Sequence, residues 1–242
     1  MDKELFRVII SENQEYIGNI PLIERPLDLE ASGNYVFVGV RQAGKSYLLY
    51  QRVRQMLKQG TRLEDIVYIN FDDERLLGMT SDDFDLILQA YHSMYDGNPV
   101  FFFDEIQNVD GWANFARRLA NRKYRVYVTG SNAKMLGRDV ETVLGGRYLD
   151  MKVFPYSFRE FLSASGEKIT SGWQYGRKAD DLQRLFRTYF EWGGFPELVN
   201  FREKRVWLNS LYNRIFLNDL VVRHKIKNDD ALRLCVRRLA ES

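Results

Sequence analysis

Short apolar runs alternate with segments of helical periodicity from the amino terminus up to Pro155. The runs are rich in β-branched and aromatic residues, as is typical of buried strands, and they predict strands at 35–39, 66–70, 100–104, 125–130 and 148–154. Between them, apolar residues recur at helical spacing, as in 81–95 and 112–121. Because parallel neighbours need a crossover, which is usually a helix, this alternation predicts an α/β fold with a mostly parallel five-stranded sheet flanked by helices.

The pattern changes after Pro155, where the β-branched runs disappear. The remainder predicts helices near 157–164, 180–191, 203–222 and 229–240. We therefore expect a core at 1–165 and a separate helical region at 166–242. The chain ends inside an amphipathic pattern, ALRLCVRRLAES, without a glycine cap, which indicates one piece of a longer protein.

The amino-terminal segment, MDKELFRVIISENQ, has charges between its apolar residues and lacks the apolar core of a signal peptide. No apolar run in the chain approaches membrane-spanning length. We expect a cytoplasmic protein without a membrane partner. The stretch that follows, with IERP and DLEASG, is expected to pack beside the sheet rather than to perform chemistry.

Composition excludes some classes of protein and leaves others open. The 242 residues are 45% hydrophobic and carry 35 basic and 33 acidic side chains, so the chain can form a real core but its net charge favours no partner. A single cysteine, Cys235, excludes an internal disulfide framework. With only two histidines beside it, a zinc site is not expected.

A phosphate-binding signature follows the first predicted strand. The segment GVRQAGKS at 39–46 fits G-x-x-x-x-G-K-[ST] and is followed by a helical pattern. In such a loop the glycines let backbone N–H groups turn inward, the lysine reaches the terminal phosphates and the serine hydroxyl can bind Mg²⁺. The predicted nucleotide-binding residues are Gly39, Val40, Arg41, Gln42, Ala43, Gly44, Lys45, Ser46 and Tyr47. The alternative is a glycine-rich turn that carries a lysine by chance.

Two carboxylates end the third predicted strand, VFFFDE, which is otherwise apolar. If this strand and the first are parallel in one sheet, Asp104 and Glu105 lie at the same edge as the phosphate loop. We expect Asp104 to hold Mg²⁺ together with Ser46, and Glu105 to orient or deprotonate the attacking water. The alternative is that the acids only mark the point where the strand reaches solvent.

The fourth predicted strand ends in VTGSNAK, so Thr129, Ser131 and Asn132 are expected at the same edge. A neutral side chain there could sense the γ-phosphate and fix the attacking water, and Asn132 is the first choice. Gly-Ser-Asn is also ordinary turn chemistry, which remains the alternative.

An arginine precedes the fifth predicted strand in LGGRYLD. Arginines delivered to a γ-phosphate, often from a neighbouring subunit, accelerate hydrolysis by about 10³ to 10⁵. Arg147 is therefore a candidate arginine finger, with Arg138 as its substitute. The alternative is an ordinary surface arginine.

Five segments carry a resemblance to a known family: GVRQAGKS, VFFFDEIQ, VTGSNAKML, GGRYLDMKVFPYSFREFL and WGGFPEL. Together they resemble a large prokaryotic group of predicted AAA+ superfamily ATPases, in which the ATPase domain is followed by a carboxyl-terminal domain of unknown function. The resemblance implies a P-loop fold with the sensor strand between the phosphate-loop strand and the acid-bearing strand, then a helical lid. It also implies ATP and Mg²⁺ as ligands, with Asn132 near the sensor position.

Three functional hypotheses follow. The first is an ATPase whose hydrolysis drives or gates a conformational change. The second is a switch that holds ATP or ADP, hydrolyses negligibly and regulates contact with DNA or protein. The third, a small-molecule kinase, is weakened by the Asp-Glu pair. Ten basic and four acidic residues between Arg202 and Arg238 leave open a DNA or protein partner, and the finger hypothesis leaves open a homo-oligomer.

Overall fold

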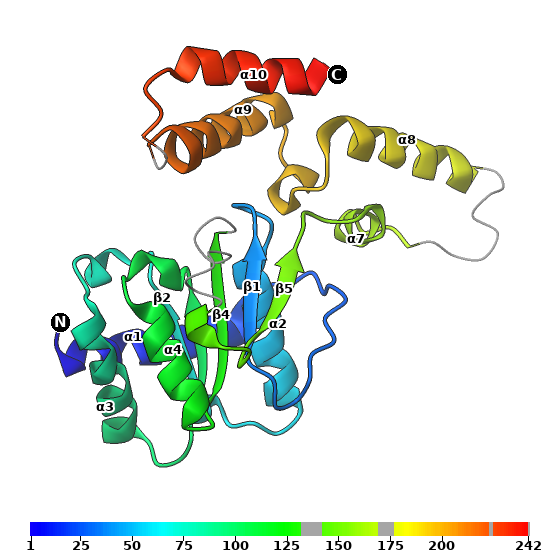
Figure 1. Cartoon of the computed structure of the whole chain (residues 1–242). Coiled ribbons are helices and arrows are strands. Elements are labelled where there is room, and N and C mark those ends of the chain that lie inside the picture. The colour runs from blue at the N-terminus through cyan, green and yellow to red at the C-terminus, as the bar shows by residue number, and fades with distance from the viewer. Residues whose placement is uncertain (132–141, 169–176, 223–224, 242) are drawn as a thin grey trace. The chain divides into compact units, whose positions relative to one another are not determined.

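In the computed structural model, five parallel strands form one sheet in the order β2-β3-β4-β1-β5 (Figure 1). The structure describes residues 1–131, 142–168, 177–222 and 225–241. The strands are β1 (Tyr35–Gly39), β2 (Ile66–Asn70), β3 (Val100–Asp104), β4 (Arg125–Ser131) and β5 (Leu149–Val153). The predicted five-stranded parallel sheet is confirmed, and β4 lies between β1 and β3 as the family resemblance implied.

Helices cover both faces of the sheet (Figure 1). The helices whose bounds the structure describes in this part of the chain are α1 (Lys3–Asn19), α2 (Lys45–Lys58), α3 (Phe84–Met94), α4 (Trp112–Asn121) and α7 (Phe158–Ala164). Short 3-10 helices are η1 (Leu63–Asp65), η2 (Glu74–Leu76), η3 (Ser81–Asp83) and η4 (Ile106–Asn108). Helices α1, α3 and α4 pack on one face, and α2 packs on the other.

The period-two geometry of a strand explains the apolar run of β3. Phe101 and Phe103 belong to the cluster under α1, α3 and α4, whereas Phe102 belongs to the cluster under α2. All five positions of β3 are buried because both faces are covered. The strand therefore reaches Asp104 still inside the protein, with that side chain 2% exposed.

Helix α1 was not among the predicted elements. Its apolar side chains Phe6, Ile9 and Ile10 are fully buried against the sheet and α3. Two of its polar side chains protect the free edge of β2, because Asn13 donates to the carbonyl of Tyr68 (3.1 Å) and Gln14 donates to that of Ile66 (2.9 Å). The amino-terminal segment thus closes one edge of the sheet.

The chain divides into two compact units, Met1–Lys168 and Ile169–Ser242. The second unit contains α8 (Arg177–Trp192), η5 (Pro196–Val199), α9 (Lys204–Arg214), the π-helical segment η6 (Ile215–Val222) and α10 (Asp229–Glu241). Leu198, Trp207 and Leu211 form its small buried cluster. Of the helices that the structure describes in either unit, none combines the length and apolarity that crossing a bilayer requires.

Candidate nucleotide-binding site

The loop at 39–46 joins the end of β1 to the start of α2, as the motif requires. Two of its residues have left-handed backbone conformations, Gln42 with φ 60° and Gly44 with φ 93°. Gly39 is needed for a different reason, since a Cβ atom there would lie 2.2 Å from the carbonyl oxygen of Val153 on β5. Gly44 therefore permits a sharp turn, and Gly39 permits the close approach of two backbone segments.

Helix α2 begins at Lys45 and has no side-chain cap at its amino terminus. The first N–H groups of a helix lack partners within the helix, and its dipole favours negative charge there. The Lys45 side chain is 4% exposed, and its Nζ lies 3.3 Å from the carbonyl oxygen of Val40 and 3.4 Å from Oε1 of Glu105. The lysine thus connects the loop to the acid-bearing strand.

Exposure varies along the predicted nucleotide-binding segment 39–47. Val40 and Tyr47 are exposed, Arg41 is half-buried and Ala43 is fully buried. Of these four side chains, only Arg41 carries a positive charge in addition to Lys45. Backbone N–H groups, the Lys45 amine and the Arg41 guanidinium are therefore the donors that this loop contains for phosphate.

Asp104 is buried among hydroxyl groups from three elements. Its Oδ2 accepts from the Tyr68 hydroxyl on β2 (2.8 Å), its Oδ1 accepts from Thr129 on β4, and the Ser46 hydroxyl on α2 is a third hydrogen-bond donor. Burial raises the pKa of Asp104, and these hydrogen bonds oppose that rise. The structure thus brings the predicted pair of metal ligands, Ser46 and Asp104, within hydrogen-bonding reach of each other.

The oxygen atoms of this pair fit a magnesium ion. Mg²⁺ prefers hard oxygen ligands and is usually bound through one or two protein groups together with substrate phosphates and water. The Asp104 carboxylate and the Ser46 hydroxyl supply such oxygens at the end of the phosphate loop. A cation bound there would also favour the charged form of the buried Asp104 carboxylate.

Glu105 has a left-handed backbone conformation, with φ 51° and ψ 39°. That conformation costs a residue with a side chain about 1–3 kcal/mol, so the surroundings must hold it. The Glu105 amide donates to Oγ1 of Thr129 (2.9 Å), and the carboxylate pairs with Lys45 and accepts from Gln107. The turn therefore directs the carboxylate toward the phosphate loop.

Thr129 is fully buried and connects the two acids, because its hydroxyl donates to Asp104 and accepts from the Glu105 amide. It was one of three predicted candidates at the end of β4. Asn132, the first choice, lies outside the described residues, as does the side chain of Ser131. Tyr68 was missed, because a tyrosine in the strand sequence IVYIN carries no signal that its hydroxyl meets an acid.

Arg147 lies at the edge of the sheet opposite the phosphate loop. It precedes β5, whose register places Leu149 beside Tyr35 at the start of β1. Its Nε donates to Oδ1 of Asn121 (2.6 Å) and its Nη1 to the carbonyl of Gly145 (3.2 Å). The structure does not bring Arg147 to the loop of its own chain, and Arg138 lies outside the described residues.

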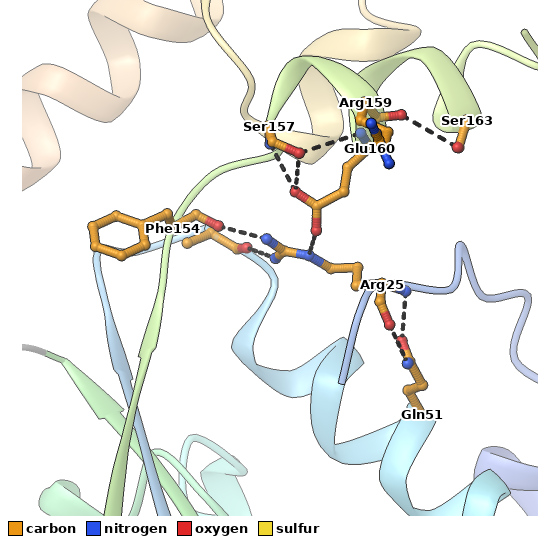
Figure 2. A network of polar contacts seen from close by, with 8 residues as sticks. Arg25, Gln51, Phe154, Ser157, Arg159, Glu160 and Ser163 are labelled. Atoms are coloured by element: carbon orange, nitrogen blue, oxygen red, sulfur yellow. Dashed lines mark hydrogen bonds and ion pairs between the residues drawn. The ribbon is translucent and has the colours of Figure 1, made fainter. Parts of the chain in front are cut away.

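Arg25 was missed as a residue of the site, because the amino-terminal segment was expected only to pack. Its guanidinium contacts the phosphate loop at the carbonyl of Ala43 (3.0 Å) and pairs with Glu160 of α7 (Nε to Oε1, 2.7 Å) (Figure 2). The local sequence IERP has no motif that indicates either contact. Only the fold brings these segments together.

The sequence model of one protein family, described as an AAA domain, matches residues 32–162, which is more than half of the chain. The chain belongs to the AAA domain family. The match includes the phosphate loop and both acids, whereas Arg25 lies outside it.

Two relatives of this AAA domain protein are similar over most of its length. An uncharacterized protein of Methanocaldococcus jannaschii is 34% identical over 231 residues, which are 93% of this chain and 51% of the relative. An uncharacterized protein of Haemophilus influenzae is 34% identical over 211 residues, 86% of this chain and 51% of the relative. The chain spans about half the length of the curated relatives it matches.

Among solved structures, the AAA domain protein is similar to Orc1 of Aeropyrum pernix in complex with DNA, at 15% identity and a TM-score of 0.39 over 90% of this chain and 67% of that chain. The family assignment rests on the sequence match, and it supports nucleotide binding.

Proposed function

We propose that the chain binds ATP with Mg²⁺ at the loop 39–46 and hydrolyses it to drive or gate a conformational change. The observation that carries the proposal is the convergence of Lys45, Ser46, Asp104 and Glu105 at one edge of the sheet. A cation, a metal-ligand pair and a second carboxylate are the groups that phosphoanhydride hydrolysis needs.

The ion pair between Lys45 and Glu105 suggests how binding prepares the site. The phosphates of ATP compete with Glu105 for the Lys45 amine, because both are anions within its reach. Once the amine turns to the phosphates, the Glu105 carboxylate is free to orient or deprotonate a water molecule. Ser46 and Asp104 would hold Mg²⁺, which would neutralise charge on the phosphates of the nucleotide.

Two further roles are proposed beyond this centre. Asn132, which follows β4, contacts the γ-phosphate or the attacking water. Arg147 acts in trans, on the nucleotide of a second copy, because its own loop lies at the opposite edge of the sheet. A homo-oligomer is then required for full activity.

The second candidate is a nucleotide-dependent switch with negligible hydrolysis. It is favoured by one observation: the Glu105 carboxylate is held by Lys45 and by Gln107. In that case, exchange of ADP for ATP changes the contact with DNA or a protein partner. The contact is made through the basic helices of the second unit, where Arg205, Arg214 and Arg238 are exposed.

Phosphate release by wild type and by Glu105→Gln tests these alternatives. For an ATPase, the variant binds ATP as tightly as wild type does, and phosphate release falls by about 10²-fold or more because the general base is lost. Near-background release in both proteins, with tight binding retained, supports the switch. A failure of wild type to bind ATP or ADP overturns both.

A further inference from the structure

The Arg25 guanidinium contacts the phosphate loop, the residue after β5 and the first turn of α7 (Figure 2). Its Nη1 donates to the carbonyl of Ala43 in the phosphate loop (3.0 Å), and its Nη2 donates to the carbonyl of Phe154, just after β5 (2.9 Å). Its Nε donates to Oε1 of Glu160 on α7 (2.7 Å). A planar guanidinium is suited to such a junction, since its donors point in fixed directions.

The backbone of Arg25 is also fixed. Gln51, buried on α2, accepts from the Arg25 amide (2.9 Å) and donates to the Arg25 carbonyl (2.7 Å). Pro26 follows and restricts Arg25 to extended geometry. The guanidinium lies 5.1 Å from the ring centre of Tyr156, and the Arg25 side chain is only 10% exposed. The side chain is thus held in place before any ligand binds.

Glu160 uses its two oxygens for two different tasks. Oε1 pairs with Arg25, while Oε2 accepts from the amide (2.7 Å) and the hydroxyl (2.8 Å) of Ser157 in the capping box that begins α7 (Figure 2). Partial burial would raise the pKa of Glu160, but the hydrogen bonds from Arg25 and Ser157 outweigh it and the pKa lies below its usual value. The start of α7 is therefore tied to the arginine.

The contact at Ala43 has a consequence for the next residue. The carbonyl of Ala43 and the N–H of Gly44 belong to one peptide unit, and in a trans peptide these two groups point in opposite directions. An arginine that holds the carbonyl therefore sets the direction of the Gly44 N–H, in the turn where Gly44 has φ 93°. A charged donor on the carbonyl also polarises the peptide and strengthens that N–H as a donor to phosphate.

We propose that Arg25 positions the Ala43–Gly44 peptide for phosphate and, through Glu160, makes the first turn of α7 respond to occupancy of the loop. The inference rests on the proposed function, because it requires that the loop binds nucleotide. A phosphate on the Gly44 N–H tightens the contact between Arg25 and Ala43, since hydrogen bonds that share one peptide reinforce each other. The arginine then holds Glu160, and with it the cap of α7, more firmly.

Three variants separate the steps of this proposal. Arg25→Lys keeps the charge but removes the fork that reaches Ala43 and Glu160 together. Glu160→Gln removes the charge partner and keeps an acceptor for the capping box. Ser157→Ala is the matched control, because it weakens the same cap and leaves the pair between Arg25 and Glu160 in place.

The measurements are ADP affinity by calorimetry, with and without Mg²⁺, and hydrogen exchange of the amides at 156–164 with and without ADP. We expect Arg25→Lys to weaken ADP binding by about tenfold or more and to abolish the ADP-dependent protection at 156–164. Glu160→Gln should lose that protection while its ADP affinity stays within about threefold of wild type. In Ser157→Ala the amides at 156–164 should exchange faster than in wild type, both with and without ADP. The gain in protection on ADP binding should nevertheless equal that of wild type.

Two results overturn the inference alone, given a wild type that binds ADP. One is that Arg25→Lys binds ADP as tightly as wild type does. The other is that ADP protects the amides at 156–164 in Glu160→Gln as much as it does in wild type. A wild type that binds no ADP overturns the proposed function instead. Exchange protection of β1 and β3 in each variant shows that the fold is retained.

Discussion

The two sides of the phosphate loop are held by ion pairs of different character. On one side, Lys45 lies 3.4 Å from Glu105 and 3.3 Å from the carbonyl of Val40, which are long contacts. On the other side, Arg25 makes contacts of 2.7 Å to Glu160 and 3.0 Å to Ala43. The first pair can exchange partners at low cost, whereas the second holds its partners firmly.

The backbone follows the same division. Glu105 has a left-handed conformation that is unfavourable for a residue with a side chain, and Thr129 holds it there. Arg25 is in the extended geometry that Pro26 favours. The strained Glu105 therefore lies on the side where chemistry is proposed, and Arg25 on the opposite side forms a rigid support.

The largest effect is expected at Lys45. In Lys45→Met the loop loses its cation at the phosphates, so ATP affinity should fall by about 100-fold or more. Calorimetric titration with ATP and Mg²⁺ measures the change. Lys58→Met is the matched control on the same helix. The Lys58 side chain is 69% exposed, and its ion pair with Glu24 is long, at 3.7 Å. An ATP affinity of Lys45→Met within threefold of wild type would show that this side of the loop is not the phosphate side.

A smaller effect, on stability, is expected at Thr129. Thr129→Val keeps the shape but removes the hydroxyl from the Asp104 carboxylate and the Glu105 amide, which costs about 1–3 kcal/mol of unfolding free energy. Urea unfolding followed by circular dichroism measures it. Thr129→Ser retains the hydroxyl and should recover most of the loss. Equal stabilities of the valine variant and wild type would mean that Thr129 does not support the strained turn.

The smallest effect is a pH dependence at Glu160. Because its pKa in the folded state lies below the ordinary value of 4.5, the pair with Arg25 contributes its full stability above that value and loses it as the pH falls through the folded pKa. The contribution should be below about 1 kcal/mol because desolvation of these two largely buried side chains offsets much of the attraction between them.

Unfolding free energies of wild type and Glu160→Gln between pH 6 and pH 3 measure this dependence. The two curves should converge at the acidic end. Glu4→Gln, which removes the exposed partner of Arg7, controls for general acid effects. A constant difference across the range would mean that the charge of Glu160 does not stabilise the fold.

Local pattern was enough to predict the sheet of the first unit. The strand at 66–70 has its predicted bounds, and the predicted strand 148–154 is β5, Leu149–Val153. In contrast, the predicted helix 203–222 is interrupted, because α9 ends at Arg214 and continues as the π-helical η6. Hydrophobic periodicity reports which side of an element is buried, but it does not report the number of residues per turn closely enough to distinguish these helices.

The sequence by itself determined the parallel sheet, the phosphate loop and the expectation that Asp104 and Glu105 share its edge, because these follow from periodicity and from a motif of adjacent residues. Only the tertiary structure placed Tyr68 and Thr129 on Asp104, Arg147 at the opposite edge and Arg25 between Ala43 and Glu160. Arg25 and Glu160 are separated by 135 positions. Contacts across such separations depend on strand order and packing, and neither leaves a local signal in the chain.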